Sequence, residues 1–318
     1  MPVIPSNVHF VWIGSKLDWV HVWAMQSAAL HSQCDEIILH HVDPLDDTAQ
    51  RAALANIPRI KLKHIDPVVL LGEASRNLNI GNKLSDLYET VRSAVALSNI
   101  LRAAVLYTQG GVYLDLDTIT VKSLLPLLET PEFLGHEHIV WPHYVHHSLP
   151  LRMKSLALSG VRSLLRQLPK GYLAFRPISD HYYLAVNGAI MGSAPGGALM
   201  AQYLKAMATI PATKLQVKHA LGTHLLQQVV EHYDQTTLTI HSPDVFYPLP
   251  PEISEHWFRH QTDVDLDQVL QLNTRIAHWY ASVRTKHLVS RITPDYIENH
   301  QHIQLFSALI RKYAMSCI

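Results

Sequence analysis

The residues most able to do chemistry in this chain are two carboxylates, Asp115 and Asp117, separated by Leu116. They lie within Val112 to Thr120, a run rich in β-branched and aromatic residues that predicts a strand. Residues i and i+2 of a strand point to the same side, so both carboxylates should face one site while Leu116 packs behind them. Buried like charges repel unless a cation or a shared proton lies between them. The pair therefore predicts a site for Mn²⁺ or Mg²⁺, which bind oxygen ligands and are commonly shared with substrate phosphates.

The same spacing recurs in Asp263-Val264-Asp265-Leu266-Asp267, so an Asp-x-Asp alone is weak evidence for a metal. These aspartates precede a periodic stretch from Val269 to Leu272, where acidic side chains favour a helix N-terminus. The glycine and the distal glutamate of a calcium loop are missing. We interpret this second motif as structural.

Alternating strand and helix patterns must position the first carboxylate pair. The apolar runs that predict strands are residues 8–13, 36–41 and 60–65. Helical patterns lie between them, and this alternation favours an α/β fold with a mainly parallel sheet. From Lys83 to Gln109, apolar residues recur at helical spacing, which predicts one long helix or two consecutive helices that end at Gly110-Gly111. The strand with Asp115 follows, and ligands of α/β sheets bind at such strand ends.

Five segments of the chain carry a family resemblance. They are Ile4-Pro5-Ser6-Asn7-Val8-His9-Phe10-Val11-Trp12-Ile13-Gly14, the block 98–106, the block 110–117, Val245-Phe246-Tyr247-Pro248 and His278-Trp279-Tyr280-Ala281-Ser282. In order and spacing they resemble glycosyltransferase family 32, which includes yeast initiating mannosyltransferases and relatives of the glucosylating domain of large clostridial toxins. The resemblance implies a GT-A type nucleotide-sugar-binding fold, with a mainly parallel central sheet and helical insertions, and a retaining hexosyltransferase activity.

The resemblance also implies roles for individual residues. Asp115, Asp117 and Arg102 would be catalytic, and Asp117 and His278 would bind the metal. The residues implied to contact the nucleotide sugar are Val11, Trp12, Asn99, Arg102, Asp115, Leu116, Asn187 and Ser282. Trp12 would stack on the base, although an aromatic residue at the end of the first strand is equally suited to the core. His278 is one of 22 histidines, so its match to a metal ligand also arises easily by chance.

The donor favoured by the resemblance is a UDP-sugar, because the opening block is more similar to the toxin branch, and GDP-mannose is the alternative. A hexose or N-acetylhexosamine would pass to a glycan, a lipid-linked acceptor or a protein. The sequence singles out no separate nucleophilic carboxylate, so we expect a front-side displacement. Two other functions stay open: a haloacid-dehalogenase-type phosphatase, whose later Gly-Asp-x-x-x-Asp is missing here, and a non-catalytic nucleotide-sugar-binding module.

Composition limits the class of protein. The chain has 318 residues, 48% of them hydrophobic, with 26 Lys and Arg against 26 Asp and Glu. We expect a single globular domain over residues 1–318. A nucleic-acid partner is not expected, because neutralising phosphates needs an excess of clustered cations. No signal peptide or membrane span is expected. We therefore predict a cytoplasmic protein, either free or attached at the inner face of the membrane, with a secreted effector as the alternative.

Residues 141–185 predict a basic helical insertion on the acceptor or membrane side. Residues 141–179 contain six cationic side chains and no Asp or Glu. Apolar residues from Met153 to Leu168 recur among these cations at helical spacing, as in helices that lie on anionic membranes. In that case Arg162 and Arg166 should contribute to lipid binding. The alternative is a lid or acceptor-domain helix packed against the core.

Overall fold

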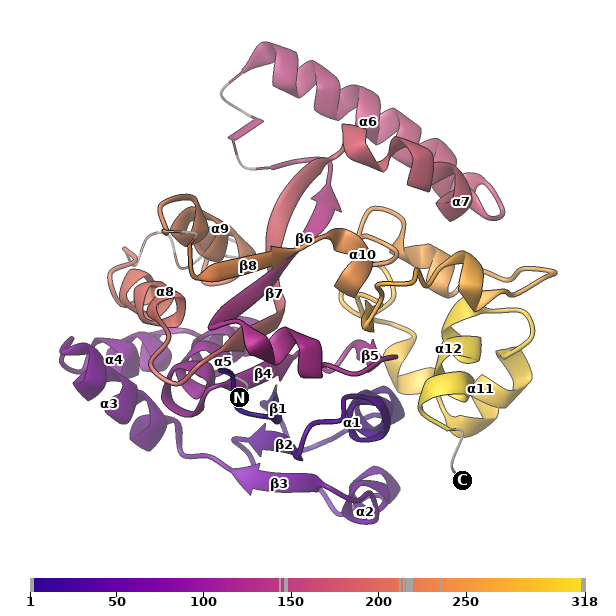
Figure 1. The fold of residues 1–318 in the computed structure, drawn as a ribbon. Coiled ribbons are helices and arrows are strands. Elements are labelled where there is room, and N and C mark those ends of the chain that lie inside the picture. Colours follow the sequence, from indigo (N-terminus) through magenta and orange to yellow (C-terminus); the bar gives the residue numbers. More distant parts are fainter. Residues whose placement is uncertain are drawn as a thin grey trace.

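The computed structural model describes residues 3–142, 144–145, 148–211, 213, 215, 220–234 and 236–315. Within them, a seven-stranded sheet of order β3-β2-β1-β4-β7-β6-β8 forms the centre (Figure 1). Its strands are β1 (Asn7–Trp12), β2 (Glu36–His41), β3 (Ile60–His64), β4 (Gly111–Leu114), β6 (Glu132–Ile139), β7 (Tyr183–Ser193) and β8 (Leu238–His241). Strand β7 is antiparallel to β4 and β6, whereas the other pairs are parallel. The predicted fold class, α/β with a mainly parallel central sheet and helical insertions, is confirmed.

Helices cover both faces of the sheet (Figure 1). They are α1 (Trp19–His31) and α2 (Ala49–Ala55) on one face, and α3 (Pro67–Leu78), α4 (Lys83–Thr90), α5 (Ala94–Gln109), α8 (Ala198–Ala208) and α9 (Thr223–Glu231) on the other. Side chains of β1 alternate between the two cores: Val8 and Phe10 pack in the core on the α1 side, and Val11 packs in the core with α3 and α5. Burial on both faces explains why β1 is almost continuously apolar.

Helix α5 delivers the chain to the centre of the sheet. The helical pattern of residues 83–109 forms two helices, α4 and α5, separated by residues 91–93. Gly110 ends α5 with a φ of 68°. At Gly111, φ is 103°, and a Cβ atom would lie only 2.8 Å from the carbonyl oxygen of Asn7. Glycine here therefore allows β4 to begin directly against β1.

The predicted continuous strand through the Asp-x-Asp motif is wrong. Strand β4 ends at Leu114, and β5 (Thr118–Thr120) pairs instead with β9 (Ile276–His278) in a separate two-stranded sheet. The chain must leave one sheet and enter the other, so residues 115–117 form a turn between them. The Thr118 hydroxyl stabilises this turn by donating to the carbonyl oxygen of Asp115 at 2.7 Å.

The C-terminal part packs a third core beside the small sheet. Its elements are α10 (Pro243–Phe246), α11 (Pro294–His300), α12 (Leu305–Tyr313) and the 3-10 helices η5 (Ser254–Trp257), η6 (Leu266–Gln268) and η7 (Val289–Arg291); a further 3-10 helix, η1 (Leu125–Glu129), follows β5. Trp279 is fully buried in this core against Phe258 and Phe306. This core fixes the segment that follows β9 next to the turn at residues 115–117.

The basic insertion is helical, as predicted. It contains α6 (Leu149–Gln167), α7 (Gly171–Phe175) and η3 (Arg176–His181), which lie at the outer ends of β6 and β7 (Figure 1). Residues 143, 146 and 147 of the insertion lie outside the described residues. Arg162 forms an ion pair with Glu252 at 2.7 Å, and Arg166 pairs with Glu255. Acidic side chains from later in the chain thus already pair with these two arginines, and their expected role in lipid binding stays a prediction.

Candidate active site

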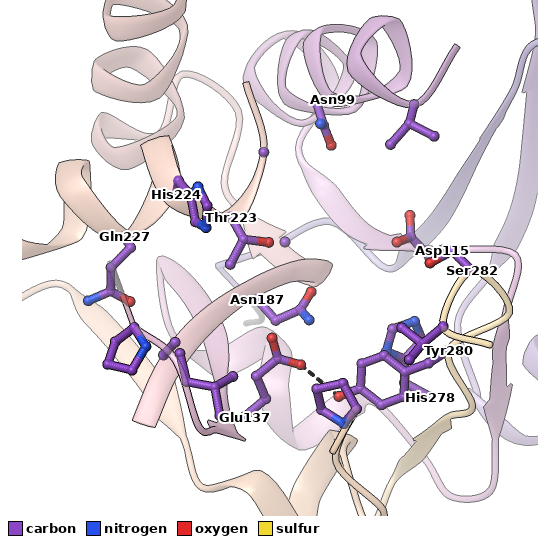
Figure 2. A pocket seen from close by; sticks show the side chains of 18 of the residues that line it. Asn99, Asp115, Glu137, Asn187, Thr223, His224, Gln227, His278, Tyr280 and Ser282 are labelled. Atoms are coloured by element: carbon purple, nitrogen blue, oxygen red, sulfur yellow. Dashed lines mark hydrogen bonds between the residues drawn. The ribbon is translucent and has the colours of Figure 1, made fainter. Parts of the chain in front are cut away.

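A pocket of about 370 Å³ opens beside the turn at residues 115–117 (Figure 2). Its volume is within the range typical of sites for small molecules. The predicted site residues that line it are Asn99, Arg102, Asp115, Asp117, Asn187, His278 and Ser282. They come from α5, the turn after β4, β7, and the segment from β9 onward. The fold therefore gathers most of the predicted site from four separate parts of the sequence.

Three predicted contacts do not line this pocket. The side chains of Val11 and Leu116 are buried in the cores on opposite faces of the sheet. Trp12 is partly buried, and its indole packs against His21 with ring centroids 4.4 Å apart. Burial lowers the pKa of His21 to about 4, and the opposing effect of Asp117 shows that this ring lies near the metal motif. Trp12 thus lies near the Asp-x-Asp turn but outside the pocket wall.

Arg102 and Asp115 form a buried ion pair at one wall of the pocket. The Nη1 atom of Arg102 lies 3.2 Å from Oδ1 of Asp115 and donates to the carbonyl oxygen of Gly188 at 2.7 Å. The Tyr113 hydroxyl donates to the same Asp115 oxygen at 2.6 Å. Burial alone would lower the pKa of Arg102, but the Asp115 carboxylate raises it above its usual value. Arg102 is therefore a permanent cation in the pocket.

Asp117 and His278 form a second ion pair. The Nε2 atom of His278 lies 2.9 Å from Oδ1 of Asp117, and the backbone N–H of Ala281 donates to Oδ2 at 2.8 Å. Burial disfavours both charges, yet their mutual attraction lowers the pKa of Asp117 and raises that of His278. The β5–β9 pairing sets this contact, because Thr118 and His278 are register partners.

The carboxylates of Asp115 and Asp117 and the imidazole of His278 fit a divalent metal ion. One ligand atom from each residue lies within 4.8 Å of the others. Two carboxylates and one imidazole are suitable ligands for Mn²⁺. Mg²⁺ could bind the same residues and would keep more water ligands. Burial raises the pKa of Asp115, and the negative charge of Asp117 raises it too. A cation between the two carboxylates would relieve their repulsion.

Glu137 and Tyr280 are among the pocket residues that the sequence did not single out as site residues. The Tyr280 hydroxyl donates to Oε2 of Glu137 at 2.7 Å, which Figure 2 shows as a dashed line. Asn187 is a second hydrogen-bonding partner of the Glu137 carboxyl, whose pKa is raised by burial. Glutamate is depleted in strands and is seldom buried without a partner. A glutamate inside strand β6 was therefore a signal that could have identified it.

A family model, described as the glycosyltransferase sugar-binding region containing a DXD motif, matches residues 57–134. Asp115-Leu116-Asp117 is the Asp-x-Asp sequence within that range. No curated protein matches the chain. The match assigns the turn to a glycosyltransferase region, as predicted, and does not single out family 32.

Solved structures similar to the chain are also glycosyltransferases. The PaToxG glycosyltransferase is 13% identical, with a TM-score of 0.43 over 72% of this chain and 69% of that one. The ligand-free glycosyltransferase domain of the YGT toxin is 11% identical, with a TM-score of 0.46 over 76% and 81%. Mouse xyloside xylosyltransferase 1 is 13% identical, with a TM-score of 0.41 over 86% and 98%. These likenesses are too distant to indicate a substrate, and the match over residues 57–134 supports the broad class of glycosyltransferases.

Proposed function

We propose that the protein is a metal-dependent glycosyltransferase that moves a hexose or N-acetylhexosamine from a nucleotide diphosphate sugar with retention of configuration. The observation that carries this proposal is the cluster of Asp115, Asp117 and His278 in one pocket with the buried cation Arg102. The two carboxylates need a cation between them. That metal ion and Arg102 would together supply the positive charge that a departing nucleoside diphosphate needs.

Asp115, Asp117 and His278 would hold Mn²⁺ or Mg²⁺. When bound, the ion supplies charge neutralisation for the departing diphosphate. Arg102 would add its own positive charge, and Asn99 lies one helical turn earlier on the same face of α5, where it can contact the ribose or a phosphate. Trp12 would stack on the base. We favour a UDP-sugar as the donor, with GDP-mannose as the alternative.

Transfer would break the bond between C1 of the sugar and the β-phosphate oxygen, which keeps the electron pair. The acceptor oxygen would bond to C1 from the same face, and its proton would pass to the departing phosphate oxygen. The partners of the pocket carboxylates support this front-side displacement. Glu137 is held by Tyr280 and Asn187, and Glu252 is held by Arg162 and the backbone N–H of Val140. Both carboxyl groups are thus engaged as hydrogen-bond acceptors and are poorly suited to attack C1.

The acceptor would be a glycan, a lipid-linked glycan or a protein. A cytoplasmic location remains our prediction, with secretion as an effector as the alternative. Among the described residues, no helix has both the length and the apolar character needed to cross a bilayer.

A screen of nucleotide sugars tests the proposed function. The full chain is incubated with UDP-glucose, UDP-galactose, their N-acetylhexosamine analogues and GDP-mannose, with and without Mn²⁺ and a chelator. We expect one donor to be hydrolysed to the nucleoside diphosphate, with loss of activity in the chelator and recovery on adding Mn²⁺. Donor binding without hydrolysis would favour a non-catalytic module. Release of inorganic phosphate from phosphomonoesters would favour a phosphatase.

A further inference from the structure

Helix α6 exposes an apolar face to solvent. Leu149, Met153, Leu156 and Leu164 are 56% to 69% exposed. Their spacing places them on one face of the helix, together with Gly160. The opposite face is buried through residues such as Leu158 and Leu165. Helix α6 is therefore apolar on two faces, and the described residues of the chain cover one of them.

The rim of this outer face is cationic. Arg152 and Lys154 are exposed near the start of α6, and within the described residues neither belongs to an ion pair. Lys154 lies over the ring of Tyr183, with its Nζ 4.4 Å from the ring centroid. The inner cations Arg162 and Arg166 are neutralised by Glu252 and Glu255, and residues 141–179 contain no acidic side chain. Arg152 thus lies at the edge of the exposed apolar face with no ion pair among the described residues, whereas Lys154 lies on the side of α6 that faces Tyr183 of β7.

The same helix is attached to the rim of the pocket. Trp141 and Tyr144 lie between β6 and α6, line the pocket and are partly exposed at the surface. The indole Nε1 of Trp141 donates to the hydroxyl of Ser159 on α6 at 3.0 Å. Aromatic side chains with a polar end are favoured at the boundary between water and lipid. Trp141 therefore links the wall of the pocket to α6.

We propose that the outer face of α6 binds the surface of an anionic lipid bilayer and brings the pocket to an acceptor held at that surface. Binding of α6 to the bilayer does not depend on the proposed function, whereas the delivery of the pocket to an acceptor rests on it. Charge favours a bilayer over a second copy of the chain. A second copy on this face would bring Arg152 close to its own equivalent, with no acid in the segment to pair with it. Lipid phosphates supply the missing negative charge, while acyl chains cover Leu156 and its neighbours.

Co-sedimentation of the full chain with vesicles tests this proposal. We expect the chain to sediment with vesicles of phosphatidylcholine mixed with phosphatidylglycerol, to stay in solution with pure phosphatidylcholine, and to be released by added salt. The double variant Leu156→Glu/Leu164→Glu should weaken partition by about tenfold or more, because it places two carboxylates on the lipid-facing side. Arg152→Glu should weaken it by roughly tenfold, since one cation is replaced by an anion.

A matched control comes from exposed apolar residues on another helix. Val68 and Val69 of α3 are 62% and 64% exposed, and Val68→Glu/Val69→Glu should sediment like the unchanged chain. Donor hydrolysis in solution should be equal in all these variants, which shows that each is folded. Vesicle binding without hydrolysis of any donor would support the lipid site and contradict the proposed function. Absence of binding to the anionic vesicles would overturn the lipid site, as would a dimer in solution that Leu156→Glu/Leu164→Glu converts to a monomer.

Discussion

Two segments of the chain have the same acidic spacing and different surroundings. The side chains of Asp115 and Asp117 are 27% and 17% exposed and face Arg102 and His278. The side chains of Asp263 and Asp267 are 72% and 87% exposed. Because water screens charges at the surface, the like charges of the second group repel one another only weakly. The comparison teaches that burial and fixed cations, rather than the spacing itself, give an Asp-x-Asp its chemistry.

The second motif has the local role that its sequence indicates. The Asp265 carboxylate accepts from the backbone N–H of Asp267 at 2.9 Å and so caps the short 3-10 helix η6. Asp263 pairs with Lys170 at 3.3 Å, and Asp267 pairs loosely with Lys312 at 3.9 Å. The helix expected over residues 269–272 is not formed: η6 ends at Gln268, and although Val269 is buried, Leu272 is 89% exposed. The carboxylates here cap and pair, and within the described part of the chain no imidazole or buried arginine forms an ion pair with them.

The largest expected difference between the two motifs is in turnover. Asp117→Asn should lower the rate of donor hydrolysis by about 10² to 10³, because a charge that holds the metal and the ion pair is lost. Asp265→Asn is the matched change and should leave the rate unaltered. The measurement is the rate at saturating donor and Mn²⁺ for both variants. Near-normal turnover of Asp117→Asn would remove the basis for treating the first motif as the metal site.

The next effect concerns the histidine beside the first motif. His278→Ala should raise the Mn²⁺ concentration needed for half-maximal hydrolysis by at least roughly 10-fold to 100-fold, the loss seen when partners of metal ligands are removed. His256 is a suitable control, because it is also buried and its Nε2 contacts the carbonyl oxygen of Leu165 at 3.1 Å. His256→Gln should change thermal stability and not the Mn²⁺ requirement. Equal Mn²⁺ dependence in His278→Ala and the unchanged chain would exclude His278 as a ligand.

Two tryptophans near the first motif, Trp12 and Trp279, should respond differently to replacement by alanine. Trp12→Ala should weaken binding of the nucleoside diphosphate by roughly 1–3 kcal/mol if the indole stacks on the base. Trp279 is fully buried, so Trp279→Ala should instead lower the free energy of unfolding by about 3–5 kcal/mol. Calorimetric titration with the diphosphate and chemical denaturation separate the two outcomes. A Trp12→Ala variant that is destabilised but binds the nucleotide normally would assign Trp12 to the core.

Local patterns predicted much of this arrangement. They predicted the alternation of strands and helices and the end of α5 at Gly110, while the family resemblance named Arg102, Asp115, Asp117 and His278, which line one pocket. The prediction that was wrong, a continuous strand, depended on pairing between distant segments. The strand through residues 112–120 breaks because β5 pairs with β9, more than a hundred residues later, and no local pattern encodes that partner.

The partners of charged side chains were equally hidden in the sequence. Arg162 and Arg166 have no acidic neighbour along the chain, yet Glu252 and Glu255 reach them across the fold. Glu137 was overlooked because its partners, Tyr280 and Asn187, come from other strands and loops. Residue types therefore predict which chemistry a chain can hold, while the tertiary fold decides which charges remain available for it.

The smallest expected effect is on the stability contributed by the second motif. Asp265 makes one capping hydrogen bond, and replacement of a capping carboxylate commonly costs about 0.5–2 kcal/mol. Its contribution should lie at the low end, because η6 has only three residues and solvent can replace the lost bond. The Asp263–Lys170 pair is largely exposed on the aspartate side, and such pairs contribute about 0–1 kcal/mol. The double variant Asp263→Asn/Asp265→Asn should therefore show a slightly lower melting temperature with unchanged hydrolysis and Mn²⁺ dependence. A clear loss of Mn²⁺-dependent activity in this variant would mean that the surface motif also takes part in metal binding, and exposure would then fail as the property that separates the two motifs.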